Sequence, residues 1–501
     1  MTMKAVFCIT LRRGIGMKLR ELLKDIDIIS SKGDLDVEIN GIVYDSRKTK
    51  KGNLFICVSG YTQDGHKYIS DALQKGAAAF IVEKDVDVKG ASVVKVQSSR
   101  TAMPLLASTF YNNPTQRLRL VGITGTNGKT TTTYLIKSIM EANKQKTGLL
   151  GTISTQIGDK IFVSSRTTPE SLDLQSLFRE MADSDIDYAV MEVSSHSLEL
   201  GRVDGCNFRI GVFTNLTQDH LDFHKTIENY RNTKKKLFYM TKGANIINID
   251  DEHGRIIADE VRTLGIQIIT YGIDNKADIM AKNIDITAKG VAFTLVTPEY
   301  ETELSIKIPG KFSVYNALAA ATVAYAEGIG RDAIKEGLNN VDNVPGRSEI
   351  VKTNTPYTVI VDYAHTPDGL RNILASVKQY AKGRVLTLFG CGGDRDREKR
   401  PIMGEIAGRM SDFCIVTSDN PRSEEPMDII RQAEAGIKST GCDYICIENR
   451  RDAIKYALTM AKPDDIVLLA GKGHETYQVL KDRTIPFDER DIVEELLREE
   501  I

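Results

Sequence analysis

The most informative stretch for chemistry is a glycine-rich turn between an apolar run and a helical pattern. It reads LRLVGITGTNGKTTTT over residues 118–133. A strand thus leads into a loop whose N–H groups and following helix N-terminus favour an anion, and Lys129 adds a positive charge. The usual P-loop pattern has glycine where this chain has Ile123, but Gly-Lys-Thr-Thr at a strand-to-helix switch argues against an ordinary turn. We interpret the stretch as a variant loop for a nucleoside triphosphate, with Thr130 as a Mg²⁺ ligand.

Acidic and histidine side chains follow other strand-like runs. Glu192 lies in the apolar run 188–193, where a carboxylate can hold a Mg²⁺ ion that bridges nucleotide phosphates. A surface glutamate is the alternative, but the apolar context favours burial, and a buried carboxylate needs a cation or hydrogen-bond donors. Residues 219–224 read DHLDFH. Because histidine is a common metal ligand, this density favours a metal or nucleotide role for His220 over an ordinary polar loop.

Charged loops follow several strand-like runs in the C-terminal third. Arg395 and Arg422 lie in two of them, with Asp419 close to Arg422. An arginine can bind a carboxylate through two hydrogen bonds, and an aspartate can hold an ammonium group. Each residue alone is more often a surface charge, but together at the strand ends of one sheet they suggest a pocket for a zwitterionic amino acid. By spacing alone, the KKK run at 234–236 is interpreted as a solvated helix face.

The composition is typical of a large soluble protein. The chain has 501 residues, 41% hydrophobic and 27% charged, for which about three domains are expected. A net charge of −2 gives no bulk attraction to nucleic acid or to an anionic membrane. No apolar run approaches the ~18 residues of a membrane span, and the N-terminus lacks the features of a signal peptide. Seven cysteines, none in C-x-x-C spacing, indicate reduced thiols in the cytosol rather than disulfides or a zinc site.

The elements that must position these residues follow an α/β pattern. Strand-like runs alternate with helical patterns, which favours parallel sheets covered by helices. We expect three domains, at 1–117, 118–344 and 345–501, with a break at 112–114 and a linker at 344–346. The central domain is predicted to hold a parallel P-loop sheet with an antiparallel patch at 278–308, where short strand-like runs follow one another. The last domain is predicted to be a second, Rossmann-like open sheet.

The order of these motifs resembles the Mur ligase family over essentially the whole chain from Met17. The resemblance rests on the stretches GTNGKTT (125–131), TTPES (167–171), MEVSSHSLELGR (191–202), FTNLTQDHLDFH (213–224), YRNTK (230–234), GKFSVYNALAA (310–320), VPGRSE (344–349), DYAHTPD (362–368), GCGGDRDREKRP (390–401), SDNPR (418–422) and AGKGHE (470–475). It implies that the three domains bind, in turn, a UDP-linked substrate, ATP and an amino acid.

The resemblance implies a cytoplasmic ATP-dependent ligase of peptidoglycan precursor synthesis, with Mg²⁺ as cofactor. Family members with Asp-Asn-Pro-Arg add meso-2,6-diaminopimelate to UDP-N-acetylmuramoyl-L-alanyl-D-glutamate through an acyl phosphate, and residues 419–422 match them. The guanidinium of Arg422 fits the extra carboxylate that lysine lacks. The alternatives are a lysine-adding ligase of the same family, a ligase acting on folate, and a nucleotide-dependent switch. We expect a monomer that binds neither nucleic acid nor membrane.

The resemblance also implies roles for individual residues. Lys129, Glu192, His220 and Lys234 match catalytic positions, of which Lys234 is the lysine that the family carbamoylates to N6-carboxylysine, and Thr130, Glu192 and His220 match Mg²⁺ positions. ATP-binding positions are matched by Gly125, Thr126, Asn127, Gly128, Lys129, Thr130, Thr131, Asn316 and Arg347, with Asp362 and His365 near the nucleotide. Positions for the UDP-linked substrate are matched by Tyr44, Ser46, Tyr61, Thr62, Gln63, Thr167, Thr168, Ser194 and Arg202, although residues 61–63 depart from the common His-Gln-Ala. Diaminopimelate positions are matched by Arg395, Asp419, Asn420, Pro421, Arg422, Gly471 and Glu475.

Overall fold

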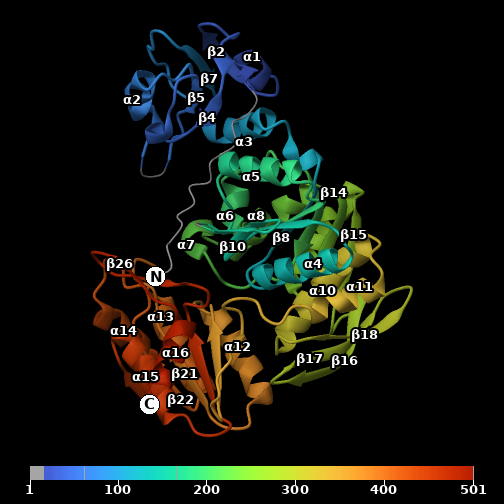
Figure 1. Cartoon of the computed structure of the whole chain (residues 1–501), viewed down its shortest axis with the longest axis vertical. Coiled ribbons are helices and arrows are strands. Elements are labelled where there is room, and N and C mark those ends of the chain that lie inside the picture. Colours follow the sequence, from blue (N-terminus) through green and yellow to red (C-terminus); the bar gives the residue numbers. More distant parts are fainter. Residues whose placement is uncertain (1–15, 61–62, 165, 500–501) are drawn as a thin grey trace.

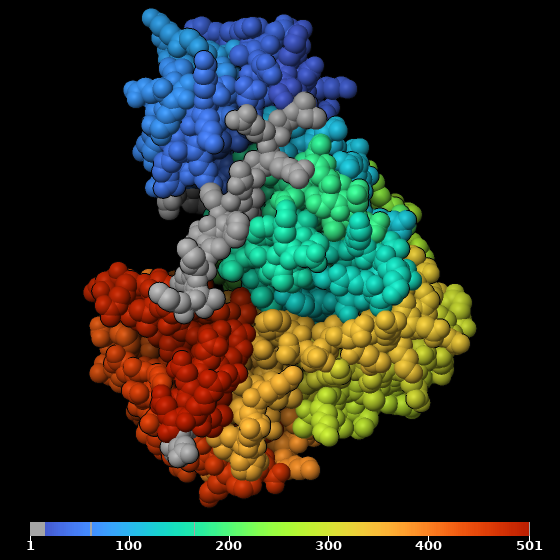
Figure 2. Space-filling model, viewed as in Figure 1, coloured from blue at the N-terminus to red at the C-terminus, as the bar shows by residue number. Residues whose placement is uncertain are grey.

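Three large β-sheets succeed one another along the chain in the computed structural model, which describes residues 16–60, 63–164 and 166–499. Figure 1 shows the N-terminal lobe in blue at the top, the central lobe in green and yellow, and the C-terminal lobe in orange and red. The space-filling view in Figure 2 shows the blue lobe projecting from the rest, whereas the C-terminal lobe lies against the yellow part of the central one.

The N-terminal lobe is built on a five-stranded sheet with the order β2-β7-β6-β5-β4. Strands β4 to β7 are parallel, and β2 pairs antiparallel with β7 at the edge. The strands are β2 (Ile28–Lys32), β4 (Gly41–Val43), β5 (Asn53–Ile56), β6 (Ala79–Val82) and β7 (Ser92–Val96). A small sheet joins β1 (Met17–Lys18) to β3 (Glu38–Ile39), and the helices are α1 (Leu19–Leu22), α2 (Ile69–Gln74) and α3 (Ser99–Phe110).

The central sheet has eleven strands in the order β11-β10-β9-β12-β8-β13-β14-β15-β16-β17-β18. The run from β9 to β16 is parallel, and β17 is antiparallel to its two neighbours, β16 and β18. The predicted parallel sheet with an antiparallel patch is therefore confirmed. The strands are β8 (Arg119–Thr124), β9 (Thr147–Leu150), β10 (Ser154–Ile157), β11 (Lys160–Val163), β12 (Tyr188–Glu192), β13 (Phe208–Phe213), β14 (Thr241–Asn248), β15 (Gln267–Gly272), β16 (Ile279–Thr287), β17 (Gly290–Val296) and β18 (Glu301–Ile306).

The helices of the central lobe pack closely where glycine permits it. A Cβ at Gly337 would stand 2.4 Å from the Cα of Ile139, so α11 approaches α4 backbone to backbone. This contact fixes α4, whose first residue is Lys129. The helices are α4 (Lys129–Ala142), α5 (Ser171–Asp183), α6 (Ser195–Glu199), α7 (Leu221–His224), α8 (Ile227–Tyr239), α9 (Glu252–Val261), α10 (Lys311–Ala326) and α11 (Arg331–Asn339).

The C-terminal lobe is a six-stranded open sheet with the order β19-β20-β24-β21-β22-β23. All its pairs are parallel except the edge strand β19, so the predicted Rossmann-like sheet is confirmed. The strands are β19 (Glu349–Val351), β20 (Thr358–Asp362), β21 (Val385–Phe389), β22 (Phe413–Val416), β23 (Tyr444–Cys446) and β24 (Ile466–Ala470), with a hairpin of β25 (Tyr477–Val479) and β26 (Thr484–Pro486). The helices are α12 (Pro367–Tyr380), α13 (Lys399–Met410), α14 (Pro426–Lys438), α15 (Arg450–Met460) and α16 (Glu489–Arg498). Across the described residues, every helix is too short or too polar to cross a bilayer.

Candidate active site

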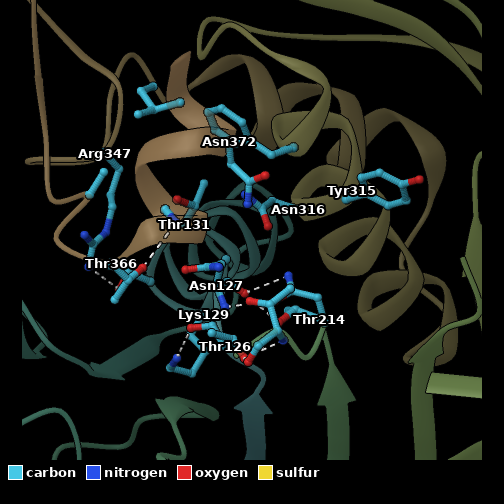
Figure 3. Close-up of a pocket in the computed structure, with 18 of the residues that line it drawn as sticks. Thr126, Asn127, Lys129, Thr131, Thr214, Tyr315, Asn316, Arg347, Thr366 and Asn372 are labelled. Atoms are coloured by element: carbon cyan, nitrogen blue, oxygen red, sulfur yellow. Dashed lines mark hydrogen bonds between the residues drawn. The ribbon is translucent and has the colours of Figure 1, made fainter. Parts of the chain in front are cut away.

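A cavity of about 720 Å³ opens beyond the carboxyl ends of β8, β12 and β13 and reaches the C-terminal lobe. Residues 126–131 and 214–220 form one part of its wall, and residues between 347 and 379 form another. Figure 3 shows Asn127 and Lys129 from the loop, with Asn372 and Thr366 on the side of the C-terminal lobe. Open α/β sheets bind ligands beyond the carboxyl ends of their strands, and this volume suits a nucleotide.

The glycine-rich loop lies tightly against the residues that follow β13. A Cβ at Gly125 would stand 1.9 Å from Thr214 Oγ1, and one at Gly128 would stand 2.4 Å from Asn316 Oδ1. Both glycines have positive φ angles, 150° and 87°. Thr214 Oγ1 donates to the Asn127 carbonyl oxygen at 2.6 Å, which fixes the middle of the loop. The loop therefore requires glycine at both positions, and α4 begins with its N-terminus at the cavity.

Lys129 holds its ammonium group inside the loop. Its Nζ donates to the carbonyl oxygens of Gly125 and Thr126, both at 2.8 Å. Burial lowers the pKa of Lys129, whereas the charges of Glu192 and Asp219 raise it. A polyphosphate in the cavity would offer stronger, charged acceptors than these carbonyls, so the side chain is suited to neutralising phosphate charge.

Glu192 ends β12 and is only 1% exposed. Its Oε1 accepts from Thr130 Oγ1 at 3.0 Å and from the Thr152 backbone N–H at 2.7 Å, and its Oε2 accepts from Thr152 Oγ1 at 3.0 Å. Arg347 Nη2 also donates to Thr130 Oγ1, at 3.2 Å. A carboxylate beside a hydroxyl supplies the oxygen ligands that Mg²⁺ prefers, so Thr130 and Glu192 fit the ion that the sequence predicts. Thr152, which sequence reasoning missed, holds the carboxylate in place.

His220 lines the same cavity. Its Nε2 lies 3.4 Å from Asp219 Oδ2, yet burial lowers the pKa of His220 to about 4. The imidazole is therefore neutral near pH 7, as a metal ligand must be. Among the described residues, no three His, Cys, Asp or Glu side chains converge as a preformed metal centre.

Lys234 is buried under the loop, with 1% of its surface exposed. Its Nζ donates to the Gly125 carbonyl oxygen at 2.8 Å and lies 4.4 Å from the centre of the Tyr230 ring. Burial first, and the charge of Lys129 second, hold the pKa of Lys234 well below its usual range. The interpretation as a solvated face, made from spacing alone, is wrong for this residue. It fits Lys236, whose side chain is 49% exposed and pairs with Glu199 at 2.7 Å, whereas Lys235 is half-buried and pairs with Glu260 at 2.7 Å.

Four residues predicted for the UDP-linked substrate gather around the end of β12. Thr168 Oγ1 donates to the Glu192 carbonyl oxygen at 2.8 Å and accepts from the Ser194 N–H at 3.1 Å. Thr167 Oγ1 lies 3.1 Å from Thr152 Oγ1. Arg202 pairs with Glu170 at 2.9 Å and donates to the Thr168 carbonyl oxygen at 3.3 Å. These side chains therefore adjoin the glycine-rich loop.

The other residues predicted for that substrate belong to the N-terminal lobe. Tyr44 donates its hydroxyl to Asp173 Oδ2 of α5 at 3.0 Å, which ties this lobe to the central one. Ser46 is buried, and Gln63 accepts from the Tyr68 hydroxyl at 3.3 Å. Tyr61 and Thr62 lie outside the described residues. The structure thus brings none of the three described residues into the large cavity.

The residues predicted for diaminopimelate gather at the ends of three adjacent strands, β21, β22 and β24. Asn420 Nδ2 donates to Glu475 Oε2 at 2.9 Å, and Arg422, at a φ of 54°, donates Nη1 to the Gly393 carbonyl oxygen at 2.7 Å. A Cβ at Gly392 would stand 2.9 Å from Arg422 Nη1 and 3.8 Å from Arg395 Cγ, so the two arginines flank that glycine. Asp419 and Pro421 are buried, and Gly471, at a φ of 115°, would place a Cβ 3.0 Å from Asp419 Oδ2. None of these residues lines the cavity of about 720 Å³.

The C-terminal lobe adds walls to the cavity that sequence reasoning only partly found. Asp362, predicted near the nucleotide, accepts from the N–H groups of Ser348 at 2.6 Å and Ala364 at 2.8 Å, and so braces the linker against β20. His365 lines the cavity, with its Nδ1 2.8 Å from the Tyr363 carbonyl oxygen. Asn372 and other residues of α12 also line it, but they carry no motif that could have identified them.

Comparisons with known proteins match this chain along almost its whole length. Family models match residues 38–111 (Mur ligase family, catalytic domain), 123–324 (Mur ligase middle domain) and 346–473 (Mur ligase, glutamate ligase domain). A UDP-N-acetylmuramoyl-L-alanyl-D-glutamate–2,6-diaminopimelate ligase of Clostridioides difficile strain 630 is 50% identical over 481 residues, which cover 96% of this chain and 99% of that relative. The enzyme of the same name from Caldanaerobacter subterraneus subsp. tengcongensis is 52% identical over 484 residues, with 96% and 99% covered.

The chain also superposes on solved structures of Mur ligases. A structure of UDP-N-acetylmuramoyl-L-alanyl-D-glutamate–2,6-diaminopimelate ligase superposes with a TM-score of 0.70 at 32% identity, covering 97% of this chain and 99% of the other. The MurF ligase of Thermotoga maritima in complex with ADP superposes with a TM-score of 0.61 at 19% identity, covering 92% and 97%. At 19% identity, the similarity to the MurF ligase supports only a shared fold.

Proposed function

This chain belongs to the Mur ligase family of ATP-dependent ligases, and from this premise we propose that it joins meso-2,6-diaminopimelate to UDP-N-acetylmuramoyl-L-alanyl-D-glutamate. The observation that carries the proposal is identity of 50% over 481 residues to a ligase named for these substrates. Arg422 supports it, because a guanidinium beside the proposed amino-acid pocket can pair with the carboxylate that distinguishes diaminopimelate from lysine.

The reaction we propose has two steps. An oxygen of the D-glutamyl γ-carboxylate attacks the γ-phosphorus of ATP, the bond to the bridging oxygen breaks, and ADP leaves an acyl phosphate. The amine of diaminopimelate, having lost a proton, then attacks the acyl carbon, and inorganic phosphate leaves as the amide forms. Both steps bring anions together, so fixed positive charge lowers their barriers. No covalent bond to the enzyme is needed.

We assign the charge-handling roles to the residues around the glycine-rich loop. Lys129 and the N–H groups of 125–131 would bind the β- and γ-phosphates, and Asn316 and Arg347 would hold the nucleotide from α10 and the C-terminal lobe. Thr130, Glu192 and His220 would hold Mg²⁺, which when bound neutralises phosphate charge. Lys234, whose low pKa favours the neutral amine, would add its nitrogen to CO₂ and release a proton, giving a carbamate anion beside this site.

We propose that the three lobes divide the substrates as the sequence suggested. Residues 1–117, with Tyr44, Ser46 and 61–63, would bind the UDP end of the nucleotide-linked dipeptide, and Thr167, Thr168, Ser194 and Arg202 would bind its peptide end. Residues 118–344 would bind ATP. Residues 345–501 would bind diaminopimelate, with Arg422 and Arg395 on its carboxylates and Asp419 and Glu475 on its ammonium group. We further propose that the protein is a cytoplasmic monomer, as the family resemblance implies.

The test is an assay of ADP release with UDP-N-acetylmuramoyl-L-alanyl-D-glutamate and one amino acid at a time. We expect kcat/KM for meso-diaminopimelate to exceed that for L-lysine by about 10³-fold or more, because lysine lacks the carboxylate that would pair with the half-buried Arg422. Equal turnover of lysine would contradict the assignment and favour the lysine-adding ligase. Rapid ATP hydrolysis without any amino acid would favour a nucleotide-dependent switch.

A further inference from the structure

Lys472 is a fully buried lysine next to the proposed amino-acid pocket. It follows Gly471 at the end of β24, and its side chain is 0% exposed. Lysine is almost never fully buried unless its charge is paired, because removing an ammonium group from water is costly. The groups around Lys472 therefore indicate what its charge does.

Its ammonium group binds two side chains that we assign to diaminopimelate. Nζ donates to Glu475 Oε2 at 3.1 Å and to Asn420 Oδ1 at 3.3 Å. Asn420 Nδ2 donates to the same Glu475 oxygen at 2.9 Å, so the three side chains form a closed triangle. Both bonds to Glu475 use Oε2, which leaves Oε1 for a ligand. The rings of Tyr477 and Phe487, at 5.8 and 5.9 Å, cover the ammonium group.

A different buried charge holds the strands themselves. Arg450 pairs with Glu489 at 2.8 Å, and both side chains are 0% exposed. Arg450 Nη2 also donates to the Ala470 carbonyl oxygen at 2.9 Å, at the end of β24. The backbone beneath the pocket is thus anchored by Arg450, whereas the hydrogen bonds of Lys472 Nζ to described residues go to the side chains of Asn420 and Glu475. A purely architectural role would not require that choice of partners.

We propose that Lys472 is a positioning residue that sets Glu475 and Asn420 to receive the ammonium group of the amino-acid substrate. Asp419, Glu475 and Lys472 together carry two negative charges and one positive charge, so a substrate ammonium group would balance the charge of these three side chains. Without Lys472, Glu475 is free to adopt other rotamers, and its carboxylate is no longer preorganised. The inference rests on the proposed function, since it concerns the same pocket.

The experiment measures KM for each of the three substrates in K472M and in K472Q, which retains a hydrogen-bond donor. We expect KM for meso-diaminopimelate to rise about tenfold or more in K472M and less in K472Q, while KM for ATP and for the UDP-linked dipeptide stays within about twofold. The matched control is R384M, which removes an ion pair to Asp465 of 2.6 Å at the amino ends of the same strands. It should lower the thermal midpoint without changing KM for diaminopimelate.

A double variant separates positioning from general stability. If Lys472 acts through Glu475, adding K472M to an E475Q background should raise KM for diaminopimelate by less than about twofold. An unchanged KM in K472M and K472Q, an equal rise for all three substrates, or full additivity with E475Q would overturn the inference. Failure of the wild-type protein to use meso-diaminopimelate would instead overturn the proposed function. If K472M does not fold, K472Q alone decides, by the same KM comparison.

Discussion

At the scale of single residues, one backbone carbonyl oxygen accepts hydrogen bonds from two lysine side chains. The Gly125 carbonyl accepts from both Lys129 and Lys234, each at 2.8 Å. Two ammonium groups so close repel each other, which agrees with the low pKa of Lys234. A carbamate on Lys234 would replace this repulsion with attraction, because it turns a cation into an anion. The geometry thus gives a physical reason for modifying this lysine rather than its neighbours on α8.

Lys234→Ala is expected to lower kcat by about 10²-fold or more, since it removes a charge that we place beside the reacting phosphate. Short carboxylic acids such as acetate or propionate should restore part of the activity by occupying the space of the carbamate. The assay is ADP release with and without the acid. Lys236→Ala, whose side chain on α8 is 49% exposed, is the matched control and should remain near wild type. Full activity in Lys234→Ala would contradict the proposed modification.

Arg422 is expected to set the choice of amino acid. In Arg422→Met, kcat/KM for meso-diaminopimelate should fall about 10²-fold, while that for L-lysine should not fall, because lysine has no carboxylate for the guanidinium to bind. Arg397→Met is the control, as Arg397 is 68% exposed and pairs with Glu424 in the neighbouring loop. A parallel loss for both amino acids would show that Arg422 merely supports its loop.

At the scale of elements, the turn from β8 into α4 is packed tightly against the end of β13. Gly125→Ala places a methyl group within 1.9 Å of Thr214 Oγ1 in the present structure, so either the loop or the end of β13 must move. We expect KM for ATP to rise about tenfold or more, with a smaller change for the amino acid, because phosphate binding depends on the loop backbone. Gly330→Ala, where nothing lies within 4 Å, is the control. Unchanged ATP kinetics in Gly125→Ala would show that the loop is adaptable.

The elements also show how far sequence reasoning reached. The parallel strands were predictable because apolar runs bounded by polar loops identify buried strands. The β10–β11 hairpin was missed, although Gly158-Asp159 between two short strands is a hairpin signal. The edge strand β19, of three residues, has no periodicity to detect.

Individual sites were harder to predict than elements. The family resemblance, which the comparisons confirm, predicts a role for Lys234, whereas spacing alone suggested a solvated position and the structure shows the residue buried. Its burial depends on how α8 packs under the loop, and no local pattern encodes that packing. Thr152 and the residues of α12 could not be identified from the sequence for the same reason, since their roles arise from contacts with segments distant in sequence. The hydrogen bond from Tyr44 to Asp173 joins residues 129 apart in the sequence. It depends on how two lobes are placed relative to each other, which no local pattern predicts.

At the scale of the whole molecule, the nucleotide cavity and the proposed diaminopimelate pocket are separate in this structure. The residues at 419–422 do not line the cavity, so in the proposed reaction the amine would have to move towards the acyl phosphate. We expect the lobes to close when substrates bind. Small-angle scattering with a non-hydrolysable ATP analogue, Mg²⁺ and the UDP-linked dipeptide should give a smaller radius of gyration than the free protein. Scattering profiles that superpose with and without these ligands would count against closure.

The hydrogen bond from Arg347 to Thr130 has a consequence for the protein's own synthesis. The glycine-rich loop leaves the ribosome more than two hundred residues before Arg347 and α12, which supply the remaining walls of the cavity. A nascent or truncated chain therefore has the phosphate-binding turn but an open site. Such a chain is poorly equipped to retain ATP until the lobe that receives the amino acid begins to fold. The cavity is therefore complete only when the segments that contain Arg347 and α12 have been added to the chain.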